Sequence, residues 1–403
     1  MRVLKTVQSY FPFKERGGTV FKVRAIARGL ARRGHQVTVL TADLGIRGRN
    51  TDGSFERCEW GWRSEEDGVE VVYLSTLARY RAVTVNPGVL RFCGASLRDF
   101  DLVHIYGLYD LLGPAAGRAC RREGIPYVLE PMGMYRPIVR NIGLKKLYLG
   151  LFGERLAAGA RWVIATSEQE RRELAEAGID SARIAIRGNG VDPPKSLPAR
   201  GEFRRRWRVA DEAKVTLFLG RVVSKKRPDL LIQAFGDWRA TSREGQNSVL
   251  VIAGPSEEDR YAAGLKSLAR SAGISGNVLF VGPLYDEEKW QAYRDADVFV
   301  LPSENENFGN TAAESAACGT PVIVTDRCGI APFVEGAGLV VRPERSEIAA
   351  ALGRILDDPD FARKCRESCS GVAKQLSWDA PLDECERLYQ QCLATGVEQR
   401  VVA

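Results

Sequence analysis

The chain has 403 residues, enough for two or three domains of ordinary size. With 45% hydrophobic and 27% charged residues it has the composition of a globular protein, and no stretch approaches the roughly 18 consecutive apolar residues of a membrane-spanning helix. The net charge of +7 is too modest to indicate a nucleic-acid-binding protein. Nine cysteines without a Cys-x-x-Cys pair argue against a disulfide framework or a zinc site and favour buried thiols in a reducing cytoplasm.

Short apolar runs alternate with longer amphipathic stretches in the first half of the chain. The run at residues 1–7 predicts a first buried strand, and it lacks the cleavage site of a signal peptide. Further strands are predicted at 37–41, 69–74, 102–105 and 162–165, and helices at 21–33 and 145–157. This alternation is typical of a doubly wound parallel sheet, so the predicted fold class is α/β.

The same alternation starts again in the second half. Five more strands are predicted at 215–219, 249–253, 278–281, 298–301 and 322–325. A helical stretch follows at 346–376, with a break expected near Pro359, and a last helix is predicted at 382–393. We therefore predict two Rossmann-like domains in tandem.

The predicted join is rich in turn-forming residues. Residues 188–194 contain Gly, Asn and Pro at high density, and a hinge is expected near 193–212. The domains are accordingly predicted at 1–195 and 196–379. Two such domains facing one another would form a cleft at the carboxyl ends of both sheets, where ligands usually bind.

The sharpest chemical signal is the segment from Pro302 to Glu314. A predicted strand ends at Leu301, a polar turn follows, and a helix is expected to begin near Thr311. Gly309 would let the backbone approach a ligand, and the helix N-terminus would suit a phosphate. Glu314 has two interpretations: it accepts hydrogen bonds from the vicinal hydroxyls of a ribose, or it only closes a capping box with Thr311.

The segment 302–314 resembles the E-x7-E donor-site motif of a large group of retaining glycosyltransferases, often called family 4, which have the GT-B fold. Residues 317–325 resemble the "A-x-G-x-P-V-I" stretch of that group, and 219–235 resemble its "G-R-x-x-x-x-K-G" element. The resemblance implies that Arg221 and Lys226 neutralise the donor pyrophosphate. Arg227 stands where the family usually has Gly, which leaves Lys225 as an alternative to Lys226.

The resemblance extends into the first half. Gly17 and Gly18 precede a helix that ends near His35, as in the N-terminal signature of the family, where the glycines let the loop approach the donor; His35 itself is expected to be structural. Met132 stands where the family often has a reacting-centre His, so a His-based role is in doubt. His104 would either point into the cleft or pack inside its strand.

The resemblance also implies a site and a reaction. The catalytic residues would be Arg221, Lys226 and Glu306, and the substrate-binding residues Gly17, Gly18, Met132, Asn307, Phe308, Gly309, Asn310 and Glu314. The expected donor is a UDP- or GDP-sugar, and the expected acceptor is a glycan or lipid-linked molecule of cell-surface polysaccharide or glycoconjugate synthesis. The last helix, 380–397, would cross back to the N-terminal domain.

No cofactor, metal or nucleic-acid partner is expected. Asp295 and Asp297 form a D-x-D pattern, but the pair precedes a buried strand and is expected to bond turns. Without a metal, Arg221, Lys226 and helix N-termini would have to stabilise the leaving diphosphate.

Two other functions remain open. One is a catalytically silent sugar-nucleotide-binding protein, which Met132 and Arg227 favour. The other is a nicotinamide-dependent dehydrogenase, which is disfavoured because no G-x-G-x-x-G follows the first strand.

Basic and aromatic residues are interleaved in the N-terminal half. They are Arg79, Tyr80, Arg81, Arg91, Phe92, Arg136, Arg140, Lys145 and Lys146. These residues either dock the protein to the anionic inner face of a membrane or belong to ordinary helix surface.

Overall fold

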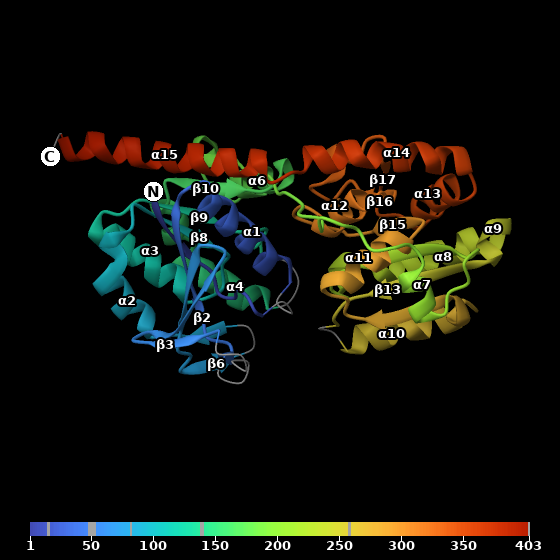
Figure 1. Ribbon diagram of the computed structural model, residues 1–403, viewed down its shortest axis with the longest axis horizontal. Helices are drawn as coiled ribbons and strands as arrows, with labels where there is room; N and C mark the ends of the chain where they lie inside the picture. Colours follow the sequence, from blue (N-terminus) through green and yellow to red (C-terminus); the bar gives the residue numbers. More distant parts are fainter. Residues whose placement is uncertain (14–16, 47–53, 81–82, 138–140, 257–258, 402–403) are drawn as a thin grey trace. The chain divides into compact units, whose positions relative to one another are not determined.

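A computed structural model describes all residues of the chain except 14–16, 47–53, 81–82, 138–140, 257–258 and 402–403. The chain divides into two compact units (Figure 1). Unit 1 comprises Met1–Gly188 and Trp378–Ala403, and unit 2 comprises Asn189–Ser377. The division after Gly188 lies seven residues before the expected boundary at residue 195, within a stretch that forms neither helix nor strand.

Unit 1 is built on a nine-stranded sheet in the order β11-β10-β9-β8-β1-β2-β5-β4-β3. Its strands are β1 (Arg2–Thr6), β2 (Gln36–Ala42), β3 (Glu56–Cys58), β4 (Gly61–Glu66), β5 (Val69–Leu74), β8 (Leu102–Tyr106), β9 (Tyr127–Glu130), β10 (Trp162–Ala165) and β11 (Ile184–Ile186), with a separate hairpin of β6 (Ala78–Tyr80) and β7 (Val83–Val85). Its α-helices are α1 (Gly18–Arg32), α2 (Gly88–Ser96), α3 (Leu112–Glu123), α4 (Ile142–Tyr148), α5 (Glu154–Gly159), α6 (Glu168–Glu176) and α15 (Asp379–Val401). Two short 3-10 helices, η3 (Leu97–Asp99) and η5 (Ser181–Arg183), and one π-helix, η4 (Leu149–Gly153), complete unit 1.

Helices cover both faces of this sheet. Two adjacent residues of β1 show that both faces are covered. Val3 belongs to one hydrophobic core and Leu4 to another, and both side chains are fully buried. A strand that is buried on both faces is apolar without alternation, which is why its sequence predicted a parallel, doubly wound sheet.

One edge of the sheet departs from the prediction. From β11 to β5 every pairing is parallel, but β4 pairs with β5, and β3 with β4, in antiparallel fashion. β3 and β4 are rich in charged residues and partly exposed, so they lack the apolar runs by which the other strands were predicted.

Unit 2 is built on an entirely parallel six-stranded sheet in the order β14-β13-β12-β15-β16-β17. Its strands are β12 (Lys214–Leu219), β13 (Ser248–Ala253), β14 (Val278–Gly282), β15 (Val298–Leu301), β16 (Val322–Thr325) and β17 (Gly338–Val341). Its α-helices are α7 (Glu202–Trp207), α8 (Pro228–Thr241), α9 (Arg243–Gln246), α10 (Asp259–Ser271), α11 (Asp286–Asp295), α12 (Asn310–Ala317), α13 (Arg345–Leu356) and α14 (Pro359–Gln375), and its short turns are η6 (Ser224–Lys226), η7 (Ser275–Asn277) and η8 (Ala331–Phe333). The five predicted strands and the helix break before Pro359 are confirmed; β17, which is short and half-exposed, was not predicted.

The last helix returns to unit 1, as the resemblance implied. It runs from Asp379 to Val401, longer than the predicted 382–393. α15 packs closely on α1, because a Cβ atom at Gly29 would lie 2.5 Å from Leu382 Cδ1. His35 has the structural role expected of it, because its Nε2 lies 2.6 Å from Glu386 Oε1 on α15.

A buried polar cluster ties α15 to the sheet. Lys5 Nζ donates to Tyr389 OH at 3.2 Å, and His104 Nδ1 lies 2.6 Å from the same hydroxyl. His104 Nε2 faces Glu130 Oε2 at 3.4 Å, and Arg187 Nη2 lies 3.0 Å from Glu130 Oε1. His104 is fully buried and packs inside the cluster, so the second of its two expected placements is the observed one.

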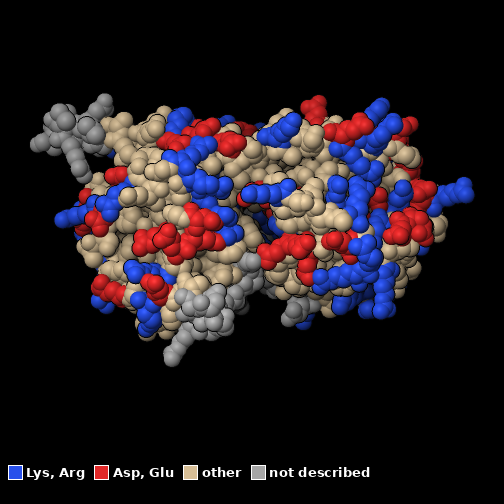
Figure 2. Space-filling view, in the orientation of Figure 1, with Lys and Arg blue, Asp and Glu red and all other residues tan. Residues whose placement is uncertain are grey.

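Charged side chains of both signs are interspersed over the face of the molecule shown in Figure 2. No helix among the described residues is both long and apolar enough to cross a membrane. Phe92 does not belong to a docking surface, because it is buried and its ring packs 5.4 Å from that of Trp60. Arg81, Arg140 and the side chain of Tyr80 lie outside the described residues.

The burial of His104 predicts a pH dependence of stability. Burial lowers the pKa of His104 to about 3, against the opposing effect of Glu130, whereas the unfolded imidazole titrates near 6.5. Between pH 6.5 and 3 the unfolded chain therefore binds a proton that the folded chain does not, so this group costs about 1.4 kcal/mol of stability per pH unit as the pH falls. We expect urea unfolding at pH 7.5 and 5.5 to give a smaller difference for His104→Asn than for the natural protein. Equal differences would contradict a neutral, buried His104.

Candidate active site

The predicted site residues of unit 2 gather where the strand order reverses. In the sheet, β12 has β13 as its neighbour on one side and β15 as its neighbour on the other. The loops that leave the carboxyl ends of β12 and β15 therefore emerge side by side at a topological switch point, where open α/β sheets usually bind ligands. Arg221 and Lys226 lie in the first loop, and Glu306 lies in the second.

Backbone hydrogen bonds hold the second loop in place. Glu304 N donates to Lys225 O at 3.0 Å, which joins the loops that follow β15 and β12. Glu306 N donates to Arg327 O at 2.9 Å, and Gly329 N donates to Glu306 O at 3.0 Å, which joins the loop to the segment after β16. The loop around Glu306 is thus fixed on both sides, as a preorganised site requires.

Lys226 and Glu306 form the central ion pair of this site. Lys226 Nζ lies 2.5 Å from Glu306 Oε2, and the two side chains are 13% and 20% exposed. Burial alone would raise the pKa of Glu306, but Lys226, and then Lys225 and Arg221, outweigh burial and lower this pKa. Glu306 is therefore ionised at neutral pH and accepts hydrogen bonds rather than donating a proton.

Three cations act on this one carboxylate. Arg221, Lys225 and Lys226 all act electrostatically on Glu306, so the local charge is positive before any ligand is present. Of the two lysines, Lys226 is the one that pairs with Glu306. Its side chain lies over Gly220, because a Cβ atom built on Gly220 would be 3.5 Å from Lys226 Nζ. A cationic cluster of this kind suits a diphosphate.

Arg227 adopts the conformation for which the family's Gly is suited. Its φ is 51° and ψ 42°, in the left-handed region, and it is the N-cap residue of α8 with Pro228 following. A non-glycine residue there costs about 1–2 kcal/mol. Its guanidinium pairs with Asp229 at 3.1 Å and with Glu304, contacts that glycine lacks and that offset part of this cost.

Gly309 makes the start of α12 possible. Its φ is 111°, which disfavours side chains, and a Cβ atom would lie 2.9 Å from Ile330 Cγ2 and 3.2 Å from Leu301 Cδ2. The glycine is therefore required for packing inside unit 2. The helix begins at Asn310, whose Oδ1 accepts from Asn189 Nδ2 at 3.1 Å.

Glu314 does not close a capping box. The N-cap of α12 is Gly309, with no side-chain hydrogen bond, and Glu314 lies four residues into the helix, where it bonds to α11 instead. Lys289 Nζ donates to Glu314 Oε1 at 2.7 Å, and Tyr293 OH donates to Oε2 at 2.9 Å. The capping interpretation was wrong. Sequence reasoning also missed Lys289 and Tyr293, whose only signal is that they lie one helical turn apart.

Phe308 plays a structural part with its side chain. It is 3% exposed and its ring lies 6.1 Å from that of Phe333, inside the hydrophobic core of unit 2. Its backbone carbonyl accepts a hydrogen bond from Ile330 N at 2.7 Å. Asn307, by contrast, is partly exposed.

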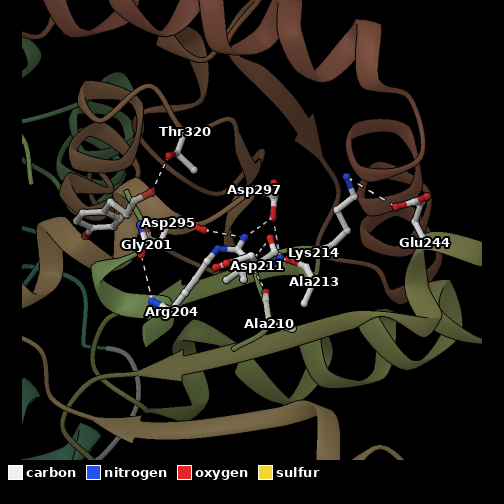
Figure 3. Close-up of polar contacts among 12 residues, drawn as sticks. Gly201, Arg204, Ala210, Asp211, Ala213, Lys214, Glu244, Asp295, Asp297 and Thr320 are labelled. Carbon is white, nitrogen blue, oxygen red and sulfur yellow. Dashed lines mark hydrogen bonds and ion pairs between the residues drawn. The ribbon is translucent and has the colours of Figure 1, made fainter. Parts of the chain in front are cut away.

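The D-x-D pattern bonds turns, as expected (Figure 3). Asp295 Oδ1 accepts from Gly201 N at 2.6 Å and its Oδ2 accepts from Arg204 N at 3.1 Å, so it caps the start of α7. Asp297 Oδ2 accepts from Val215 N at 2.9 Å and from Arg204 Nη2 at 3.1 Å. Among the described residues no group of three or more His, Cys, Asp or Glu side chains is arranged to hold a metal ion.

The predicted residues of unit 1 lie at the carboxyl edge of its own sheet. Gly17, with φ 87°, is the N-cap of α1, and no atom of the described residues lies within 4 Å of where its Cβ would be. Gly18 is the first residue of the helix. Met132 follows β9 in a left-handed turn with φ 55°. The buried Glu170 accepts from Gly133 N in this turn and from Thr166 N at 2.8 Å, a support that sequence reasoning missed.

Comparison with known families gives two matches that together cover most of the chain. A family model described as "Glycosyl transferases group 1" matches residues 199–370. A second, described as "Glycosyl transferase 4-like domain", matches residues 17–190. The first contains the switch-point residues of unit 2, and the second contains Gly17 and Met132.

Individual proteins match along nearly the whole chain. A D-inositol 3-phosphate glycosyltransferase of Thermomonospora curvata is 31% identical, over 96% of this chain and 92% of its own. The solved structure of HepE from Anabaena, in complex with UDP and glucose, has a TM-score of 0.76 at 17% identity, over 97% of this chain and 100% of that one. Sucrose-phosphate synthase from Thermosynechococcus elongatus has a TM-score of 0.75 at 20% identity, over 98% and 100%.

The packing around Gly309 predicts a large loss of stability for Gly309→Ala. Both the positive φ and the 2.9 Å approach to Ile330 oppose a methyl group, so we expect a loss of about 2–4 kcal/mol in the free energy of unfolding. Gly264→Ala is the matched control, because Gly264 lies within α10 and no described residue comes within 4 Å of its Cβ position. This change should raise the free energy of unfolding by about 0.5–1 kcal/mol. Similar unfolding midpoints for both variants would contradict the packing role.

Proposed function

Since the chain belongs to the glycosyl transferases group 1 family and has the GT-B fold, we propose that it transfers a sugar from a nucleotide-diphosphate sugar, with retention of configuration, to a glycan or lipid-linked acceptor. The observation that carries the donor half is the Lys226–Glu306 pair at the switch point of unit 2, with Arg221 and Lys225 beside it. A net positive cluster around one fixed carboxylate supports binding of a diphosphate next to a sugar.

Lys226 and Arg221 would stabilise the leaving diphosphate. The ammonium of Lys226 has three donors and one is occupied by Glu306, so it can contact a phosphate without leaving the carboxylate. Arg221 is exposed, and its guanidinium can bind a phosphate in a bidentate manner. Negative charge develops on the diphosphate as the glycosidic bond breaks, and such fixed cations lower that barrier.

Glu306 and Glu314 would bind different parts of the donor. A carboxylate has about four acceptor positions, and the Glu314 carboxylate uses two for Lys289 and Tyr293, which leaves about two for the vicinal hydroxyls of a ribose. Glu306, ionised and fixed in its loop, is suited to accept hydrogen bonds from hydroxyls of the transferred sugar. In unit 1, Gly17, Gly18 and the Met132 turn would approach the donor with backbone groups.

We infer retention of configuration from the family resemblance alone. A same-face displacement in which the donor phosphate takes the acceptor proton needs neither a protein nucleophile nor the His that Met132 replaces. We also propose that the reaction needs no metal and no further cofactor. The support is that Asp295 and Asp297 already accept hydrogen bonds from α7, β12 and Arg204.

The residues of the site constrain the identity of the acceptor less than that of the donor. We propose cell-surface polysaccharide or glycoconjugate synthesis, in the cytoplasm at the inner face of the membrane, with no nucleic-acid partner. The relative from Thermomonospora curvata is named for D-inositol 3-phosphate, so a small phosphorylated acceptor is the competing possibility to assay. A catalytically silent sugar-nucleotide-binding protein is the alternative function, and the position of Met132 still favours it.

Donor binding can be tested by thermal shift against UDP-, GDP- and ADP-sugars. A ligand at about 100 times its Kd adds about 2.7 kcal/mol of stability, which is readily measured. Glu314→Gln should weaken the best donor by about 1–3 kcal/mol, while Glu367→Gln on the exposed face of α14 should not change its affinity. If Glu314→Gln bound the donor normally but melted at lower temperature, Glu314 would serve only to join α12 to α11.

Turnover tests the roles of the cations. Arg221→Ala should lower kcat for sugar transfer or donor hydrolysis by about 10²–10³-fold with a smaller change in donor affinity, because a developing charge loses its partner. Arg243→Ala, an exposed arginine of α9, is the control and should retain normal turnover. A natural protein that binds the donor but neither transfers nor hydrolyses it would support the silent alternative.

A further inference from the structure

One helical segment of unit 1 exposes an unusual number of large apolar side chains. Ile142, Leu144, Leu147, Leu151 and Phe152, here called the α4 apolar face, are between 39% and 62% exposed. They account for five of the eleven exposed large hydrophobic residues in the described part of the chain, within eleven consecutive positions. Isolated exposed leucines are ordinary, but a cluster of this kind marks an interaction surface.

Side-chain contacts hold the segment that carries the α4 apolar face against the rest of unit 1. Tyr148 OH donates to Asp110 O at 2.8 Å, and its ring lies 5.2 Å from that of Tyr109. Leu149 and Gly153 are also buried. The segment is therefore anchored by one face, and Leu144, Leu147 and Leu151, spaced as on one side of a helix, lie on another.

The surroundings of the α4 apolar face are basic. Residues 141–155 contain Lys145, Lys146 and Arg155 against the single acid Glu154, a net charge of three minus one, or +2. Lys146 and Arg155 are exposed, and Lys145 Nζ lies 5.5 Å from the centre of the Tyr109 ring. Leucines beside lysines are the composition of a helix that lies in the interface of an anionic bilayer.

We propose that the α4 apolar face, with Lys145 and Lys146, is the surface by which this protein binds an anionic membrane. Leu144, Leu147 and Leu151 would enter the acyl boundary, and the lysines would remain among the phosphate headgroups. A second copy of the chain is a poorer occupant, because a symmetric contact would bring Lys146 of one copy against the same basic surface of the other. A bilayer satisfies both the apolar and the charged residues.

The proposal deepens the proposed function and rests on it for its biological purpose. A lipid-linked acceptor has its reactive end at the headgroup level of a bilayer. The segment that carries the α4 apolar face also follows β9 and the Met132 turn along the chain. Membrane binding would therefore bring that part of unit 1 to the depth at which such an acceptor lies.

Vesicle co-sedimentation tests the surface with the full chain. We expect the natural protein to sediment with vesicles of phosphatidylcholine and phosphatidylglycerol, less with phosphatidylcholine alone, and less as salt is raised. The triple change Leu144→Ser, Leu147→Ser and Leu151→Ser should lower the partition coefficient at least about tenfold. Val340→Ser, an exposed apolar residue of unit 2, is the matched control and should bind as the natural protein does.

A second variant reports insertion directly. Leu147→Trp should show quenching by bromine-labelled acyl chains in anionic vesicles beyond that of the seven natural tryptophans. Absence of this extra quenching, a natural protein that stays in the supernatant, or a triple serine variant that binds normally would each overturn the proposal. So would a lipid-free dimer of the natural protein that the serine variant loses.

Donor binding separates this inference from the proposed function. UDP affinity, measured by calorimetry without lipid, should be the same for the natural protein and the triple serine variant. Vesicle binding without any nucleotide affinity would support the membrane surface and contradict the proposed transferase. Nucleotide affinity without vesicle binding would support the proposed transferase and contradict the membrane surface.

Discussion

The adjacency of β12 and β15 is the constraint on which the candidate site depends. The ends of these strands, Leu219 and Leu301, are 82 residues apart in the chain, and β13 and β14 lie between them. Because β13 and β14 are added on the other side of β12, the two loops emerge side by side, and Lys226 reaches Glu306. A parallel sheet in which β12 and β15 were not neighbours would separate the cations from the carboxylate.

Both acids of the E-x7-E segment are compensated by lysine before any ligand is present. Glu306 bonds Lys226, and Glu314 bonds Lys289 as well as Tyr293. Partly buried carboxylates would otherwise lose hydration without replacement, at a large cost in free energy. The pairing also fixes the position of each carboxylate. The donor of the proposed reaction would therefore meet a preformed site in unit 2, whose loops are already bonded to one another.

In unit 1 a buried carboxylate is likewise paired with cations, in a larger cluster. Buried Glu130 holds Arg187, Lys22 and His104 around it; burial opposes its ionisation, but Arg187 and Lys22 outweigh burial and hold its pKa well below the usual range. The cluster extends through Tyr389 to the last helix, so the final segment of the chain becomes part of the first unit. No periodicity in the sequence shows this, because each partner looks like an ordinary strand or helix residue by itself.

The sequence by itself determined the features that rest on local pattern. Strands buried on both faces appear as apolar runs, and the resemblance around 302–314 and 219–235 predicted a donor segment and its cations. Tertiary structure alone decided the partners: that Glu314 bonds α11 rather than its own helix end, that Phe308 is buried, that Arg227 occupies a left-handed turn held by Asp229 and Glu304, and that leucines of α4 face outward. The physical reason is that periodicity fixes which residues share a face, whereas contacts between distant segments depend on strand order and on which helix face packs inward.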